Sequence, residues 1–163
     1  DDSDEMTLSV RFRASQSRDF VEDLKYPRLA VHGNVTPFRD TDGYQLAMSK
    51  GRLTAVVGDG EDFAVLKGPR VDDGEWHNVT LVRSGEKVQL VLDGKVVSVA
   101  TWTGTLDIDG SQFIAGHGFS GNLDYVTVTT NATDFETATL TSDRPCNPRG
   151  PVETNASLGP LQI

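Results

Sequence analysis

The sequence of 163 residues has a single cysteine, Cys146, so no disulfide can form within the chain and the thiol does not indicate a redox compartment. It also lacks an apolar run of the roughly 18 residues that a membrane-spanning helix needs. Basic residues are scarce, because 15 Lys and Arg stand against 24 Asp and Glu, a net charge of −9. That balance disfavours nucleic acid and anionic membrane surfaces as partners. It leaves glycans, cations and basic protein surfaces, or a charge that serves solubility alone.

Signatures of catalysis are missing as well. The nearest run to the E-x-D-x-E pattern of β-glucan hydrolases is 106–110, which contains no glutamate. There is no G-x-S-x-G nucleophile elbow, and the lone cysteine lies in a proline-rich segment without a paired histidine. The three histidines, His32, His77 and His117, lack the spacing of zinc ligands. We therefore predict no catalytic residues and no enzymatic activity of the chain itself, and leave open that it is a fragment of a glycoside hydrolase.

Short alternating runs separated by Gly, Asp and Asn dominate the chain, and no segment has a sustained helical period. In the first run Leu8, Val10 and Phe12 share one face, while Arg11 and Arg13 share the polar face and are interpreted as protection of a sheet edge. Hairpins are predicted around 49–51, 84–86 and 93–94. The runs that predict strands are 7–13, 29–32, 44–48, 52–57, 63–66, 76–83, 87–92, 95–100, 113–116 and 123–128. They predict an all-β fold, a two-sheet antiparallel β-sandwich.

The composition changes from Asp143 onward, where four prolines interrupt a segment with few apolar residues. We predict one sandwich domain over 5–142 and a Pro-rich linker or C-terminal strap over 143–163, which indicates a larger multidomain chain. Glycosylation sequons favour an extracellular or cell-surface location, and they lie at Asn34, Asn78, Asn131 and Asn155. Because Asn78 falls inside a predicted strand, a glycan would be hard to place there.

Two motifs in the second half of the chain are specific enough to indicate a family. The first is Asp73-Gly74-Glu75-Trp76-His77-Asn78-Val79, followed by a strand that ends in Asp93-Gly94. The second covers 119–128 and reads F-S-G-N-L-D-Y-V-T-V. Together they resemble the laminin G-like signature, which implies a jelly roll of the concanavalin A-like class. We interpret the motif residues as fold determinants and place Trp76 in the core as a large apolar side chain.

The chain is also similar to the sialic-acid-binding modules that accompany bacterial sialidases. This second similarity covers Met6–Arg13 and Phe113–Val128. It implies a glycan partner, sialylated or not, and a role accessory to a sialidase or another glycosidase.

A sugar site needs an aromatic ring for stacking and planar polar groups for the hydroxyls. Trp102 lies in a polar, turn-rich context that predicts an exposed ring, and Tyr44 opens a strand after a turn. Arg28 and Arg39 flank a loop-rich stretch, and a guanidinium fork suits a carboxylate. With His117, these residues form the predicted ligand-binding set.

Calcium is the cofactor that the loops suggest, because hard cations take oxygen ligands from loops. Candidate loops are 40–43, 59–62 and 107–109, with Asp59 and Asp62 as the predicted metal ligands. The alternative is that Asp and Gly are simply the preferred turn residues.

The leading functional hypothesis is a non-catalytic carbohydrate-binding module of a secreted or cell-surface protein. The alternative is a calcium-dependent adhesion or receptor module that binds a cell-surface protein, and a spacer without a ligand is the third hypothesis.

Overall fold

The computed structural model describes residues 4–14, 27–35, 41–107 and 110–130, and these residues form strands and no helix. Each predicted run coincides with one strand, so the all-β prediction is confirmed. The strands are β1 (Glu5–Ala14), β2 (Arg28–Asn34), β3 (Asp42–Ser49), β4 (Arg52–Asp59), β5 (Phe63–Arg70), β6 (Trp76–Ser84), β7 (Lys87–Leu92), β8 (Lys95–Thr101), β9 (Phe113–Ala115) and β10 (Gly121–Thr129). The predicted boundary at 142 and the segment 143–163 lie outside the described residues. No helix long and apolar enough to cross a membrane occurs in the described residues.

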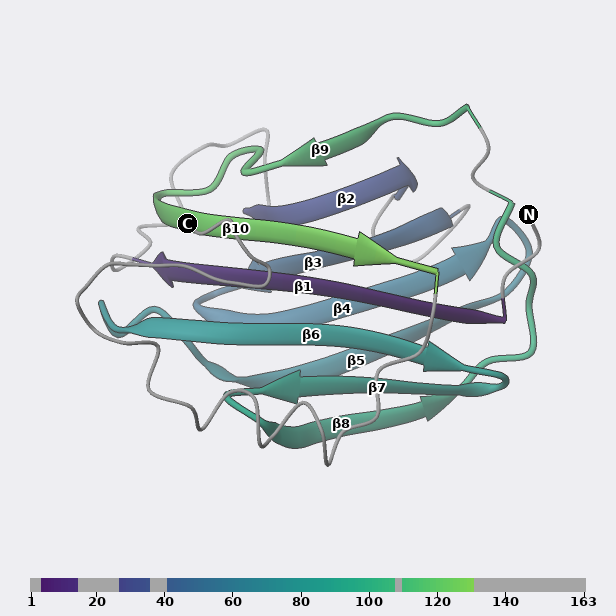
Figure 1. The fold of residues 1–163 in the computed structure, drawn as a ribbon, viewed down its shortest axis with the longest axis horizontal. Coiled ribbons are helices and arrows are strands. Elements are labelled where there is room, and N and C mark those ends of the chain that lie inside the picture. Colours follow the sequence, from purple (N-terminus) through teal and green to yellow (C-terminus); the bar gives the residue numbers. More distant parts are fainter. Residues whose placement is uncertain (1–3, 15–26, 36–40, 108–109, 131–163) are drawn as a thin grey trace. The chain divides into compact units, whose positions relative to one another are not determined.

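The strands form two antiparallel sheets of five that face each other (Figure 1). The first sheet has the order β10-β1-β6-β7-β8 and the second has the order β5-β4-β3-β2-β9. Strand β1 lies inside the first sheet, because it pairs with β10 on one side and with β6 on the other. The interpretation of Arg11 and Arg13 as edge protection is therefore wrong.

Two of the predicted hairpins turn through two successive residues with positive φ. Lys50 and Gly51 have φ of 51° and 78°, and Asp93 and Gly94 have φ of 50° and 82°. Two successive residues with positive φ match the twist of the flanking strands, as in type I′ turns. The local sequence thus fixes the register of β3 with β4, and that of β7 with β8 next to the turn, up to the register shift between Leu90 and Val91.

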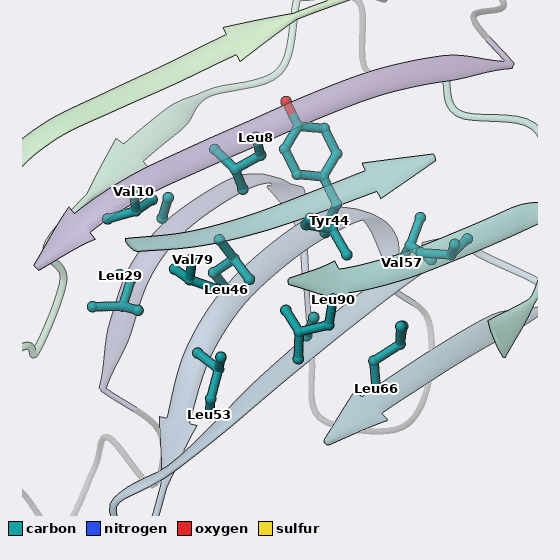
Figure 2. Packing of buried hydrophobic residues seen from close by; sticks show 14 of the residues in the cluster. Leu8, Val10, Leu29, Tyr44, Leu46, Leu53, Val57, Leu66, Val79 and Leu90 are labelled. Carbon is teal, nitrogen blue, oxygen red and sulfur yellow. The ribbon is translucent and has the colours of Figure 1, made fainter. Parts of the chain in front are cut away.

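The core fills the space between the sheets, and Figure 2 shows side chains of both sheets meeting there. Leu8, Val10 and Phe12 are fully buried on one face of β1, as their alternation predicts. Burying an aliphatic or phenyl side chain of this size contributes about 1.5–3 kcal/mol. This packing holds β1 rigidly, so the residues of opposite parity on β1 are presented on the outer face of the first sheet.

Candidate functional site

A tryptophan lies on the outer face of the first sheet. Trp76 begins β6 and pairs in register with Arg13 of β1. Its side chain is 38% exposed, so the interpretation of Trp76 as a core residue is wrong. The reason is strand parity, because Val79 and Leu81 of β6 point into the core and Trp76 has the opposite parity.

Two arginines pack on this indole ring. The guanidinium carbon of Arg11 lies 4.9 Å from the ring centroid of Trp76, and that of Arg13 lies 5.3 Å from it. Both distances fall within the range in which a cation is attracted by the electron-rich face of an indole. The two arginines therefore hold the ring in a defined orientation while more than a third of its surface faces solvent.

Polar side chains of β6 and β10 continue this surface. Asn78 and Tyr125 flank Arg11 in register, and the Tyr125 hydroxyl donates to the Asn78 Oδ1 atom at 3.1 Å. Asn122 pairs with Arg13, and Asp124 forms an ion pair with Arg11. The seven residues that form this outer surface are named here the Trp76 platform: Arg11, Arg13, Trp76, Asn78, Asn122, Asp124 and Tyr125.

Two glycines bring the strands of the platform together. Gly74 has a φ of 81° in the turn before β6, and its N–H donates to the Ala14 carbonyl at 3.0 Å, which ties that turn to the end of β1. Gly121 has a φ of 148° at the start of β10, and a Cβ atom there would overlap the carbonyl oxygen of Arg13. Since only glycine permits this approach, Gly121 sets the spacing between Asn122 and Arg13.

A histidine next to Trp76 fixes the turns on either side of the platform. The Nδ1 atom of His77 lies 2.7 Å from Asp93 Oδ2, and its Nε2 atom lies 3.0 Å from Asp73 Oδ1. The ring is largely buried and packs 5.8 Å from that of Phe12. Burial disfavours the charged form, but the hydrogen bonds and charges of Asp93 and Asp73 outweigh it and raise the pKa of His77 above its ordinary value. When charged, the imidazolium donates from both nitrogens to these carboxylates.

Residues 29–136 match the family described as Laminin G domain. This chain belongs to the laminin G domain family. The laminin G-like resemblance of its motifs is thereby confirmed.

Two curated human proteins are similar to this laminin G domain. Protocadherin Fat 1 is 32% identical over 127 residues, which cover 71% of the chain and 3% of that protein. Laminin subunit alpha-3 is 42% identical over 50 residues, which cover 30% of the chain and 2% of that protein. The chain thus spans only a few per cent of the length of these relatives.

Solved structures confirm the jelly-roll fold of this laminin G domain. The CBM40 of the Ruminococcus gnavus IT-sialidase, bound to α2,3 sialyllactose, has a TM-score of 0.65 at 15% identity, with 86% of this chain and 84% of that chain covered. The binding domain of botulinum neurotoxin DC, in complex with SialylT, has a TM-score of 0.60 at 10% identity, with 85% and 35% covered. Identities this low establish a shared fold and no more.

The prediction of an exposed Trp102 ring is wrong. Only 1% of Trp102 is exposed, its backbone N–H donates to the Glu86 carbonyl, and its Nε1 atom lies 3.4 Å from the Asp62 carbonyl. Arg83 covers the ring with its guanidinium carbon 4.4 Å from the centroid. This arginine is itself buried and donates to the Gly104 carbonyl at 2.6 Å, an arrangement that no sequence motif indicates.

Tyr44 is also unable to stack on a ligand in this structure. It is 1% exposed and lies among aliphatic side chains of both sheets (Figure 2). Its hydroxyl lies 3.0 Å from the Nδ1 atom of His32, and burial raises the pKa of Tyr44 to about 12. Tyr44 contributes to the core instead, so its place in the predicted sugar site is wrong.

Two of the remaining predicted ligand residues, Arg28 and His117, lie near β2 and β9. The Arg28 N–H donates to the carbonyl of His117 at 2.9 Å, and the Arg28 guanidinium donates to the Val35 carbonyl at 3.2 Å. The side chain of His117 is exposed. Arg39 lies outside the described residues. The structure thus brings Arg28 and His117 together, and their role in binding stays a prediction.

The predicted calcium ligands cap the loop between β4 and β5. The Oδ1 atom of Asp59 accepts from the N–H groups of Glu61 and Asp62, at 3.0 and 2.8 Å, and Asp62 Oδ1 accepts from the N–H of Phe63. Burial raises the pKa of Asp59, but these backbone donors outweigh it and hold that pKa below its ordinary value. Over the described ranges, no three His, Cys, Asp or Glu side chains are grouped as metal ligands. Since Asp59 Oδ1 is committed to backbone donors, the arrangement fits a turn cap better than a calcium cage, and calcium binding stays a prediction.

Proposed function

We propose that this laminin G domain is a non-catalytic module that binds a glycan through the Trp76 platform. The observation that carries the proposal is the exposed indole held by two guanidiniums. The apolar face of a sugar ring stacks on exposed indole surface, because both surfaces gain by leaving water. The platform supplies the second requirement of such a site, which is a set of fixed polar groups around the ring.

The polar groups suit sugar hydroxyls. Asn78 uses its oxygen to accept from Tyr125, which leaves its amide nitrogen to donate. Asn122 likewise accepts from Arg13 through its oxygen. Each amide therefore presents donors on the same side of the sheet as the indole. Hydroxyl groups, which donate and accept, are the matching partners.

The proposal includes an extracellular or cell-surface location and a weak affinity at each site. Family members named laminin and protocadherin support the location. Shallow surfaces bury little area, so a Kd of about 1 mM to 10 μM is expected for one site, and several copies would raise the avidity. The fold shared with a module of the Ruminococcus gnavus sialidase supports a role accessory to a glycosidase as one form of this proposal.

A glycan array probed with the domain tests the proposal. Trp76→Ala should lower binding about tenfold, as expected for loss of an aromatic contact of roughly 1.5 kcal/mol. Phe63→Ala is the matched control, because Phe63 is also 38% exposed but lies on β5 of the other sheet. Binding that survives Trp76→Ala unchanged would contradict the platform. No binding to any glycan would contradict the proposed function and favour a protein partner.

A further inference from the structure

The two arginines of the Trp76 platform differ in how their charge is neutralised. Arg11 Nε lies 3.1 Å from Asp124 Oδ2, so its charge is paired with a carboxylate. Arg13 instead donates from Nε and Nη2 to the Oδ1 atom of Asn122, at 3.3 and 3.0 Å. An amide oxygen carries no net charge. In the part of the chain that the structure describes, Arg13 has no carboxylate partner, and its side chain is exposed.

A β-bulge creates this difference. The register of β1 with β10 shifts between Arg11 and Phe12, so that Tyr125 pairs with Arg11 and Leu123 pairs with Phe12. Asp124 is the extra residue of β10 at that point, and its carboxylate reaches Arg11. The next pair beyond the bulge joins Arg13 to Asn122. Bulges redirect single side chains in this way, and this bulge brings the carboxylate of Asp124 to Arg11 and not to Arg13.

We propose that Arg13 binds an anionic group of the glycan, a carboxylate or a sulfate, while the sugar ring stacks on Trp76. This inference rests on the proposed function, and it adds the class of ligand and the residue that selects it. A guanidinium matches the geometry of a carboxylate or sulfate with two parallel hydrogen bonds. Arg13 can offer these because its Nη1 group has no partner among the described residues. Arg11 holds the indole and selects nothing, because Asp124 already satisfies its charge.

The net charge of the whole chain opposes the binding of acidic sugars. With a net charge of −9, the whole chain repels anions at long range, so an acidic sugar is preferred only if a local cation outweighs that repulsion. A preference for acidic over neutral sugars would therefore report on one residue rather than on a general basic surface.

The test compares three small sugars by calorimetric titration: lactose, α2,3-sialyllactose and 3′-sulfated lactose. The wild-type domain should bind at least one acidic sugar about tenfold more tightly than lactose, and the tighter acidic sugar identifies the carboxylate or the sulfate as the group recognised. Arg13→Gln should remove that preference, because it should lower affinity for the acidic sugars about tenfold more than affinity for lactose. Arg11→Gln is the matched control and should keep the preference. Asp124→Asn should raise affinity for the acidic sugars several-fold, because it frees the charge of Arg11.

Other results would overturn the inference. A wild-type domain that binds lactose and the acidic sugars equally, or an Arg13→Gln variant that keeps the preference, would contradict the role of Arg13 while leaving glycan binding intact. An equal loss for all three sugars in Arg13→Gln and in Arg13→Lys would show that Arg13 only supports the ring. Unchanged thermal midpoints would confirm that the variants fold. If no sugar binds the wild type, the proposed function itself fails.

Discussion

Truncation of the two tryptophans of this chain should lower stability by different amounts. Trp102→Ala removes an indole that is 1% exposed, and loss of a buried aromatic side chain costs about 3–5 kcal/mol. It also deletes the hydrogen bond to the Asp62 carbonyl and uncovers the guanidinium of Arg83. Trp76→Ala removes a ring that is 38% exposed and two cation–π contacts worth about 0.5–1 kcal/mol each at exposed sites, so about 1–2 kcal/mol is expected.

Urea titration followed by far-ultraviolet circular dichroism measures both costs. The predicted difference between the variants is about 1–4 kcal/mol, which corresponds to a thermal midpoint lower by roughly 2–16 °C for Trp102→Ala than for Trp76→Ala. The slope of the free energy of unfolding against urea concentration should stay the same in both variants, since the surface exposed on unfolding hardly changes. Equal costs, or a larger cost for Trp76→Ala, would refute the assignment of one ring to the core and the other to the surface.

Three further predictions concern the residues around these rings. Because its partners raise the folded-state pKa of His77, the stability that the charged ring contributes is fully present below pH 6.5 and is lost as pH rises through the folded pKa. His77→Gln should flatten the dependence of the thermal midpoint on pH between pH 5 and 9. A flat wild-type profile would refute the stabilisation of the two turns by the charged His77 ring. Gly104→Ala should cost about 1–3 kcal/mol, because its Cβ would overlap the carboxylate of Asp59 and the ring of Trp102. Gly60→Ala is the control, because no atom lies near a Cβ at that position. It should lower stability by only about 1 kcal/mol, the cost of its positive φ. Equal losses of stability in the two variants would contradict the overlap at Gly104. Asp59→Ala should lower stability by about 1–2 kcal/mol in calcium and in chelator alike, because its carboxylate caps the loop. A calcium-dependent midpoint that this variant abolishes would instead support the predicted metal site.

The strands could be predicted from the sequence because alternation of apolar side chains and turn residues are local signals. The same alternation along β6 also predicts the face of the sheet on which Trp76 lies. In β6, Val79 and Leu81 share the parity of His77, whereas Trp76 shares that of Asn78. The large apolar area of the indole favours the core, but the parity of β6 places it on the outer face.

The burial of Trp102 could not be predicted in the same way. Its neighbours Thr101, Thr103 and Gly104 are polar or lack a side chain, and the groups that cover the ring come from distant segments. Arg83 reaches it from β6, and the Asp62 carbonyl comes from the loop after β4. Contacts between segments remote in sequence leave no local pattern. The platform depends equally on the pairing of β1 with both β6 and β10, which the sequence does not specify.

The most direct measurement of the central claim uses the fact that the chain has only two indole groups. A ¹H–¹⁵N correlation spectrum shows one indole signal for each, and Trp76→Phe assigns them. Titration with lactose and with the two acidic sugars should shift the Trp76 signal and leave the Trp102 signal in place, because only the first ring is exposed. Saturable sugar binding that moves the Trp102 signal alone, or neither signal, would contradict the Trp76 platform as the binding site.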